Sequence, residues 1–469
     1  MHELHLRKLG GAPIAIDDHE LRDALDGQLM FPDSPGYDKS RALWNAMIDR
    51  RPGVIVQARS DQDVVATVRF AARHGLSLAV RSGGHNIAGK AVCDDGIVLD
   101  LRAMNLVSVD AAARRARVGP GATLGDVDAA TQAHGLVVPT GINSTTGIAG
   151  LTLGGGFGWT TRKYGLTVDN LRSARVVTAD GQVRVADERE NPELFWAIRG
   201  GGGNFGVVTE FEFGLHPLGP EVFAGMVVHP LADAASVIPA YQTAVARAPD
   251  ELTCWAVLRK APPLPFLPPE WHGREILVLA MCYIGDTTRG PEATQALRAI
   301  GKPVAESLGP MPFVDWQKAF DPLLTPGARN YWKTHDVATF SDPAIAIIQA
   351  AVGDLPSDEC EIFFGHIGGQ MTRVSEAATP WPNRKAHFAV NVHTRWQDPK
   401  DDQRCVAWAR RLHEALAPHA MGSVYVNFIP EGDEALVRAA YGQNLERLQS
   451  IKGKLDPDNL FRANINVAA

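Results

Sequence analysis

Cysteine is scarce in this chain, and its few cysteines are not spaced as ligands. Only five of the 469 residues are cysteines: Cys93, Cys254, Cys282, Cys360 and Cys405. Their number is odd, and their spacing is not that of a zinc or iron–sulfur site. We therefore expect buried thiols, without a disulfide framework and without a metal centre.

The chain also lacks a strong excess of one charge and a long apolar run. Charged residues make up 21% of it, the net charge is −7 and no basic run occurs, which argues against nucleic acid as a partner. Residues 1–5 contain no apolar core of signal-peptide length, and no segment is long enough to span a bilayer. We expect a cytoplasmic protein without a membrane partner. A chain of this length exceeds one compact core, so at least two domains are expected.

The P-loop motif Gly-x-x-x-x-Gly-Lys-Ser/Thr is missing, although glycine is abundant, with 45 residues. Glycines gather in three regions, around residues 81–89, 139–158 and 200–209, and we do not interpret the second or third as a Rossmann turn. The flanks of these regions are apolar and typical of strands. Clustered backbone N–H groups in such loops suit a pyrophosphate, whereas loop flexibility alone is the simpler interpretation.

The first glycine region follows a predicted helix and strand. The helix begins after Ser60 and ends at Gly75, because these residues are typical cap signals. Residues 76–80 and 97–101 are predicted to be buried strands, so His85 lies on the loop that leaves the first of them. Helix, strand, glycine loop and strand in this order favour a nucleotide-binding cradle.

His85 is the residue of greatest chemical interest in that loop. A neutral imidazole nitrogen is a competent nucleophile, and the 8-methyl group of oxidised FAD can accept one. Glycines before the histidine let the backbone approach a planar ring without a Cβ in the way. Taken alone, Gly-Gly-His is a weak signal, and a histidine in a tight turn is the favoured interpretation of these three residues.

Several motifs together carry a family resemblance. They are Arg81-Ser82-Gly83-Gly84-His85, Gly154-Gly155-Gly156-Phe157-Gly158, Arg162-Lys163-Tyr164-Gly165-Leu166, the run from Phe195 to Gly202, and the C-terminal Tyr425-Val426-Asn427-Phe428, Tyr441-Gly442-Gln443-Asn444 and Asp456-Pro457-Asp458-Asn459-Leu460-Phe461. Residues 51–218 resemble the FAD-binding domain of the vanillyl-alcohol oxidase, or PCMH-type, superfamily. The whole chain is most similar to the berberine-bridge-enzyme-like branch, which includes 6-hydroxynicotine oxidase-type flavoproteins.

The resemblance implies an α+β protein of three parts. An FAD-binding domain of two α+β subdomains spans residues 1–218, with its PCMH-type core at about 48–218. A substrate-binding domain with an antiparallel sheet covered by helices spans residues 219–421, where apolar strands alternate with amphipathic helices. Residues 422–469 then return to the FAD domain.

The resemblance also implies which residues contact FAD. Val208 is expected at the adenine or ribose end, and Asn464 and Asn466 are expected to close over the isoalloxazine ring or its ribityl chain. The full expected set is Arg81, Ser82, Gly83, Gly84, His85, Asn86, Gly89, Gly141, Asn143, Thr145, Thr146, Gly147, Ile148, Gly150, Leu151, Gly154, Gly155, Gly156, Trp159, Asn170, Val208, Tyr425, Asn427, Asn464 and Asn466.

The expected attachment of FAD is a single bond through His85. Relatives often attach FAD twice, through a histidine and through a cysteine in a Gly-x-Cys-x-Thr loop. Here the corresponding loop reads Gly141-Ile142-Asn143-Ser144-Thr145, so Asn143 stands where that cysteine would be. No other cysteine is near enough in the sequence to replace it.

Candidate proton-handling residues lie on a predicted strand over residues 387–396. Its period of two places His387, Asn391 and His393 on one face. Asn391 falls where several relatives have Glu or Gln, and an amide cannot accept a proton at neutral pH. Base catalysis, if used, comes from His393, His387, Tyr425 or the substrate itself. A hydrogen-bonded sheet face is an equally good interpretation of the two histidines.

Three functions stay open. The first is an oxidase that transfers hydride from a C–H of a hydroxylated or amine-bearing small molecule to flavin N5, with O₂ reduced to H₂O₂. The second is a dehydrogenase with another electron acceptor, since Thr146 places a hydroxyl at the position that controls oxygen access in the family. The third is a non-catalytic flavin redox module. Aromatic residues between 255 and 332 favour an apolar substrate over a sugar, and the chain is expected to be a monomer or a homodimer.

Overall fold

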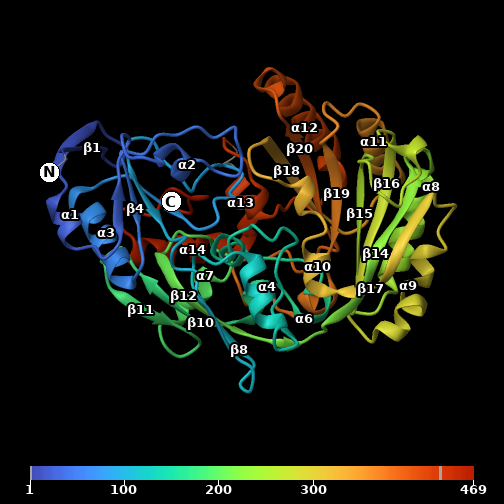
Figure 1. Ribbon diagram of the computed structural model, residues 1–469, viewed down its shortest axis with the longest axis horizontal. Coiled ribbons are helices and arrows are strands. Elements are labelled where there is room, and N and C mark those ends of the chain that lie inside the picture. Colours follow the sequence, from blue (N-terminus) through green and yellow to red (C-terminus); the bar gives the residue numbers. More distant parts are fainter. Residues whose placement is uncertain (1–2, 433–435, 469) are drawn as a thin grey trace.

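The computed structural model describes residues 3–432 and 436–468, and these form a mixed α and β structure with mainly antiparallel sheets. The α+β fold class expected from the sequence is therefore confirmed. Figure 1 shows the seven-stranded sheet at one end of the molecule and the N-terminal half of the chain at the other.

The N-terminal sheet carries the first glycine loop. Its strand order is β3 (Gln28–Met30), β4 (Val54–Gln57), β6 (Ile97–Asp100) and β5 (Leu78–Arg81), with β5 and β4 parallel to β6. Helix α3 (Asp61–His74) begins with a capping box between Ser60 and Asp63 and ends at Gly75 in the left-handed conformation, as expected. The loop with His85 leaves the end of β5.

A five-stranded antiparallel sheet carries the third glycine region. Its order is β11 (Val183–Ala186), β10 (Leu171–Val177), β12 (Val207–Gly214), β8 (Arg115–Val118) and β7 (Val107–Asp110). Gly201, Gly203 and Gly206 have the Gly-x-Gly-x-x-Gly spacing, but they follow helix α7 (Pro192–Ile198) and precede strand β12. A Rossmann turn joins a strand to a following helix, so this region is not one.

The seven-stranded sheet is entirely antiparallel and is built from residues 221–396. Its order is β17 (Ala305–Pro312), β14 (Glu221–Pro230), β16 (Glu275–Tyr283), β15 (Leu252–Lys260), β19 (Glu361–His366), β20 (Phe388–Trp396) and β18 (Arg329–Val337).

Helices cover one face of this sheet, and the opposite face has a separate apolar core. Helices α8 (Ala234–Ala246), α9 (Gly290–Arg298), α11 (Asp342–Val352) and α12 (Asp402–Leu416) pack on the outer face (Figure 1). On β20, Val390 and Val392 point into the core below these helices, whereas Ala389 belongs to the core on the opposite face. This alternation places every second residue of each central strand on the face opposite these helices.

The C-terminal segment packs against the N-terminal half of the chain (Figure 1). Helices α13 (Val437–Tyr441) and α14 (Leu445–Leu455) share a core with the five-stranded sheet. The buried Lys452 ammonium donates to Asp456 at 2.6 Å and to the carbonyls of Asn204 and Phe461. The last described residues are thereby tied to the third glycine region.

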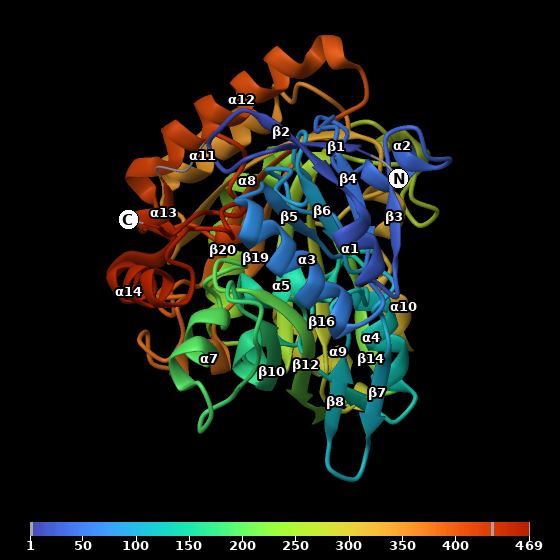
Figure 2. The same ribbon diagram turned by 90° about the vertical axis from the view of Figure 1, so that its left-hand side faces the viewer.

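The remaining elements are short (Figure 2). They are β1 (Glu3–Arg7), β2 (Pro13–Asp17), α1 (His19–Asp23), α2 (Tyr37–Arg41), α4 (Leu124–Gln132), β9 (Leu136–Val137), α5 (Ile148–Leu153), α6 (Thr161–Tyr164), β13 (His216–Pro217) and α10 (Phe313–Gln317). Among them, β1 pairs with β2 and β9 pairs with β13 in two further two-stranded sheets. Among the described residues, no helix is both long and apolar enough to cross a membrane. All five cysteines are free thiols, and all but the half-buried Cys93 are buried.

Candidate flavin and substrate site

One cavity of about 450 Å³ lies between the glycine loops and the open face of the seven-stranded sheet. Residues 82–86, 141–143, 146–147, 149–151, 202–203 and 206–208 line it on one side, together with the C-terminal residues 425–428. Strands β14, β15, β16, β18, β19 and β20 each contribute side chains to the opposite wall. Segments far apart in the sequence therefore form a single site.

The first two glycine loops meet edge to edge at this cavity. A Cβ added at Gly83 would lie 2.3 Å from the backbone nitrogen of Gly147, and a Cβ at Gly147 would lie 2.3 Å from that of Gly83. Only glycine permits this approach. Within the described chain, the backbone N–H groups of residues 83–86 donate to no acceptor, so they are available to a phosphate.

The His85 ring is held at the end of this pair of loops. Its Nε2 lies 3.0 Å from Thr145 Oγ1, its Nδ1 lies 3.4 Å from Thr146 Oγ1, and Trp44 stacks on it with 5.2 Å between ring centroids. Burial lowers the pKa of His85 to about 4, so the ring is neutral at physiological pH. A neutral imidazole keeps a lone pair on one nitrogen.

Tyr425 lies beside the triple glycine. Its hydroxyl oxygen accepts hydrogen bonds from the Gly156 backbone N–H at 3.2 Å and from the Asn427 amide at 3.0 Å. A phenol that already accepts two bonds has its own proton free to donate. Burial raises the pKa of Tyr425 to about 12, so the hydroxyl keeps that proton at neutral pH and is unsuited to act as a base there.

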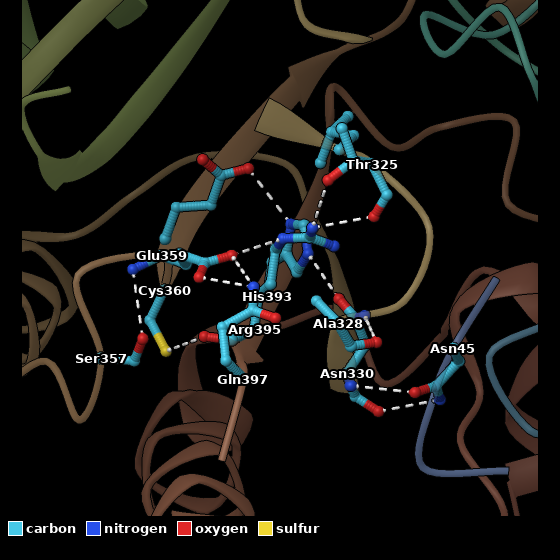
Figure 3. A network of polar contacts seen from close by, with 12 residues as sticks. Asn45, Thr325, Ala328, Asn330, Ser357, Glu359, Cys360, His393, Arg395 and Gln397 are labelled. Carbon is cyan, nitrogen blue, oxygen red and sulfur yellow. Dashed lines mark hydrogen bonds and ion pairs between the residues drawn. The ribbon is translucent and has the colours of Figure 1, made fainter. Parts of the chain in front are cut away.

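A buried ion cluster lies on the sheet wall of the cavity. Glu361 on β19 accepts from Arg259 on β15 at 2.6 Å and lies 3.1 Å from Nδ1 of His393 on β20. Although burial alone would raise it, Arg259 and His393 hold the pKa of Glu361 at about 2. The other nitrogen of His393 lies 3.3 Å from Asn330 Oδ1, and Asn330 in turn binds Asn45 (Figure 3).

Aromatic rings form most of the remaining wall. Trp332 packs edge-on against Trp44, His393 and Phe428, with centroids between 4.7 and 5.7 Å apart. Further rings that line the cavity are Phe157, Trp159, Trp255, Phe320 and Phe363. This part of the cavity is therefore an apolar chamber with the Arg259–Glu361–His393 cluster as a polar patch.

The structure brings most of the expected residues to the cavity. Those that line it are Ser82, Gly83, Gly84, His85, Asn86, Gly141, Asn143, Thr146, Gly147, Gly150, Leu151, Trp159, Val208, His393, Tyr425, Asn427 and Asn464. Asn464 also donates to the carbonyl of Gly203 at 3.0 Å. Thr145 does not line the cavity itself, but its hydroxyl contacts His85, which does.

Other expected residues do not line it and have structural partners instead. The buried Arg81 guanidinium donates to the carbonyls of Ser40 and Ala42, and Asn170 is bound to the carbonyls of Tyr164 and Leu166. Gly154 and Gly156 leave room for Asn427 and Thr167, and Gly89 leaves room for Ile48. Gly155, Ile148 and Asn466 also lie outside the lining.

The other two candidates of the predicted strand differ: His387 lies just outside β20, whereas Asn391 lies on β20, on the same face as His393. His387 is exposed, precedes the strand and does not line the cavity, because β20 begins only at Phe388. Asn391 is fully buried and also lies outside the lining. Neither Oδ1 nor Nδ2 of Asn391 has a partner in the described chain. Buried side-chain amides are nearly always hydrogen-bonded, so Asn391 is unusual in this respect.

Sequence reasoning missed several residues of the site. Trp44, Arg259 and Glu361 come from segments without a glycine motif, and Gly203 lies in a glycine region from which only Val208 was chosen. The proline-rich loop at 262–269 also contributes, because Pro262 and Leu264 line the cavity. For Glu361 one signal existed: an acidic residue within the predicted apolar strand over residues 361–366.

The residues present fit FAD. The cavity joins an unpaired backbone N–H cradle at residues 83–86 to a chamber walled by aromatic rings, which suits a molecule with a pyrophosphate and a planar ring system. His85 supplies a neutral ring nitrogen at the edge of that cavity. Among the described residues, no group of three His, Cys, Asp or Glu side chains is arranged to hold a metal ion.

Comparison with known proteins agrees with this geometry. Residues 52–187 match the model of an FAD binding domain, and residues 424–468 match the berberine and berberine-like model. The chain is 32% identical over 463 residues to (R)-6-hydroxynicotine oxidase of Paenarthrobacter nicotinovorans, covering 95% of this chain and 97% of that protein. It is 30% identical to an FAD-linked oxidoreductase of Dictyostelium discoideum, covering 96% of both.

Solved structures share the fold over nearly the whole length. The crystal structure of 6-hydroxy-D-nicotine oxidase from Arthrobacter nicotinovorans aligns with a TM-score of 0.85 at 29% identity, covering 94% of this chain and 98% of that chain. Xylooligosaccharide oxidase from Myceliophthora thermophila aligns with a TM-score of 0.84 at 24% identity, covering 96% and 98%, which supports the fold alone. The chain therefore belongs to the FAD-dependent oxidoreductases of the PCMH-type superfamily, in the berberine-bridge-enzyme-like branch.

Proposed function

We propose that this FAD-dependent oxidoreductase is an oxidase. In this proposal it removes hydride from a C–H of a hydroxylated or amine-bearing small molecule, and O₂ takes the electrons and becomes H₂O₂. The carrying observation is the single cavity that joins the His85 loop to an aromatic chamber with a polar patch. A chamber of this kind suits a small molecule with an apolar body and a few polar substituents.

Each side of the chamber has a role in this proposal. Bound FAD supplies a hydride acceptor, so the protein has to orient the substrate, exclude water and manage one proton. The aromatic rings exclude water. The Tyr425 hydroxyl donates a hydrogen bond to a substrate heteroatom, because its oxygen already accepts from Gly156 and Asn427. His393, held by Glu361 and Asn330, is the candidate for proton exchange with the substrate.

We further propose that FAD is attached through a single covalent bond to His85. One support is the neutral His85 ring nitrogen at the cavity. The other is Asn143, which lines the cavity at the position where relatives have the second attaching cysteine. After acid denaturation, the yellow colour should stay with the pelleted wild-type protein and be absent from the pelleted His85→Ala protein. Release of all flavin from the wild type would contradict the proposal.

The electron acceptor is tested by reoxidation. Photoreduced enzyme mixed with air-saturated buffer should return to the oxidised spectrum within seconds, with H₂O₂ formed in equal amount. Persistence of the reduced spectrum for many minutes would instead favour a dehydrogenase with another acceptor. This second function is considered because the Thr146 hydroxyl, beside His85, stands at the position that controls oxygen access in the family. A substrate panel read by flavin bleaching tests the third possibility, a redox module without turnover.

A further inference from the structure

Thr145 and Asn143 form a hydrogen-bond relay that ends at one nitrogen of the His85 ring. Thr145 Oγ1 lies 3.0 Å from His85 Nε2 and donates to Asn143 Oδ1 at 2.7 Å. The same Asn143 oxygen accepts from the backbone N–H of Thr145 at 3.0 Å. Nothing in the redox chemistry proposed above requires this relay.

The orientation of the Asn143 amide sets the direction of the relay. Its nitrogen donates to the Leu324 carbonyl at 3.4 Å, which leaves its oxygen as the acceptor on the other side. Thr145 has one hydroxyl proton, and that proton goes to the Asn143 oxygen. The Thr145 oxygen must therefore accept from His85, which places the imidazole proton on Nε2.

Two further contacts brace the relay from outside the loop. Trp44 stacks on the His85 ring, and its indole N–H donates to the same Leu324 carbonyl at 2.9 Å. Ser144, between the two relay residues, donates its backbone N–H to Asp321 at 2.9 Å. The segment 321–324 thus binds both the relay loop, through Ser144, and Trp44, which stacks on the His85 ring.

We propose that Asn143 and Thr145 are positioning residues that place the His85 proton on Nε2, so that Nδ1 is the atom that bonds to FAD. The inference rests on the proposed covalent attachment and specifies how this chain achieves it. Thr146 Oγ1 is the competing partner, because it lies 3.4 Å from Nδ1 and would accept a proton there if the relay were absent. At that length its hold on the Nδ1 lone pair is weak.

The bond-forming step balances with dioxygen as the oxidant. A C–N bond forms between Nδ1 and the carbon of the flavin 8-methyl group, which loses one proton. The alkylated ring then loses its Nε2 proton past Thr145, whose side chain is exposed to water. Two electrons remain on the flavin and pass to O₂, which takes up two protons to become H₂O₂. During the step, the relay stabilises the positive charge that develops on the ring.

The test compares variants of Thr145 and Asn143 in the full-length protein. Apoprotein from riboflavin-limited cells is mixed with FAD in air, and the acid-stable flavin is followed with time. Thr145→Val should slow covalent incorporation at least tenfold, whereas Thr145→Ser should restore it. Asn143→Leu should slow incorporation, and Asn143→Asp should retain it because a carboxylate also accepts. Thermal unfolding and non-covalent FAD binding serve as controls for folding.

The linkage atom gives a second readout that a merely structural role would not move. Fragmentation and NMR of the flavin peptide from the wild type should show attachment through Nδ1. Attachment through Nε2, or a wild-type incorporation rate in Thr145→Val, would overturn the inference while the proposed covalent bond stands. If the wild type holds no covalent flavin at all, the proposed attachment itself fails, and this inference fails with it. The wild-type linkage tests the assigned ring nitrogen even if a variant does not fold.

Discussion

At the scale of single residues, Tyr425 is the clearest case in which the structure defines a chemical role. Sequence reasoning left it open whether this phenol is a base. Burial raises the pKa of Tyr425 to about 12, and its oxygen already accepts two hydrogen bonds. The hydroxyl therefore keeps its proton at neutral pH and serves as a hydrogen-bond donor. His393 keeps the role of candidate for proton exchange.

Replacing Tyr425 by Phe should lower the rate of flavin reduction by substrate about tenfold or more, because a positioned proton donor contributes at least that much. Anaerobic stopped-flow measurement of flavin bleaching gives the rate. The ratio of wild type to variant should stay constant between pH 6 and pH 10, since the phenol does not ionise there. An unchanged reduction rate would remove Tyr425 from the mechanism.

At the scale of elements, the three central strands β15, β19 and β20 are joined by Glu361. This carboxylate accepts from Arg259 on one side and contacts His393 on the other, and all three side chains are largely buried. A buried charge that loses its partner is costly. The cluster therefore stabilises the sheet and shapes the polar patch of the cavity at once.

Glu361→Gln should lower the free energy of unfolding by about 3–5 kcal/mol, measured in urea at pH 7. Asp358→Asn is the matched control, because Asp358 also pairs with a cation on β15, Lys260, but is exposed, and its loss should cost less than about 1 kcal/mol. The folded pKa of Glu361 is lowered to about 2, so its contribution is present above pH 4.5 and is lost as the pH falls toward 2.

The difference between the wild type and Glu361→Gln should accordingly shrink below pH 4.5. Equal destabilisation by Glu361→Gln and Asp358→Asn would show that the cluster behaves as a surface pair. A difference that grows as the pH falls would contradict the lowered pKa. Either result would also weaken the description of this patch as a fixed feature of the cavity.

At the scale of the whole molecule, the C-terminal segment both completes the site and completes the core. The expected contact of Asn464 and Asn466 with the flavin predicts that deleting the residues after Phe461 affects flavin incorporation more than folding. In the structure, Ile465 and Val467 are buried in the core of the FAD-binding half. Losing each of them costs about 1.5–3 kcal/mol, so the truncation also destabilises the fold.

A pair of asparagines separates the two effects. Asn464 lines the cavity and binds the Gly203 carbonyl, whereas Asn466 does not line it and accepts only from the N–H of Ala468 in the described chain. In a His85→Ala background, Asn464→Ala should weaken FAD binding about fivefold, corresponding to about 1 kcal/mol, measured by titration. Asn466→Ala should leave binding unchanged. Equal weakening by both variants would contradict this placement of the tail.

The sequence by itself determined the local elements and the cofactor class. The capped helix before the first loop, the strand and glycine loop with His85, and the apolar alternation of β20 all depend on contacts within about twenty residues, and the structure confirms them. The order of the family motifs further predicted FAD and the α+β fold, because such motifs can be identified in the sequence without knowledge of the long-range contacts.

Only the tertiary structure decided which of those residues reach the cavity and what completes it. Arg81 belongs to a family motif, yet its guanidinium is turned onto the carbonyls of Ser40 and Ala42. Glu361 and Trp44 reach the site only because β19 lies between β15 and β20 and because Trp44 stacks on His85. These contacts join residues tens to hundreds of positions apart, and no local periodicity encodes such a meeting. It is decided by how the sheets and loops pack.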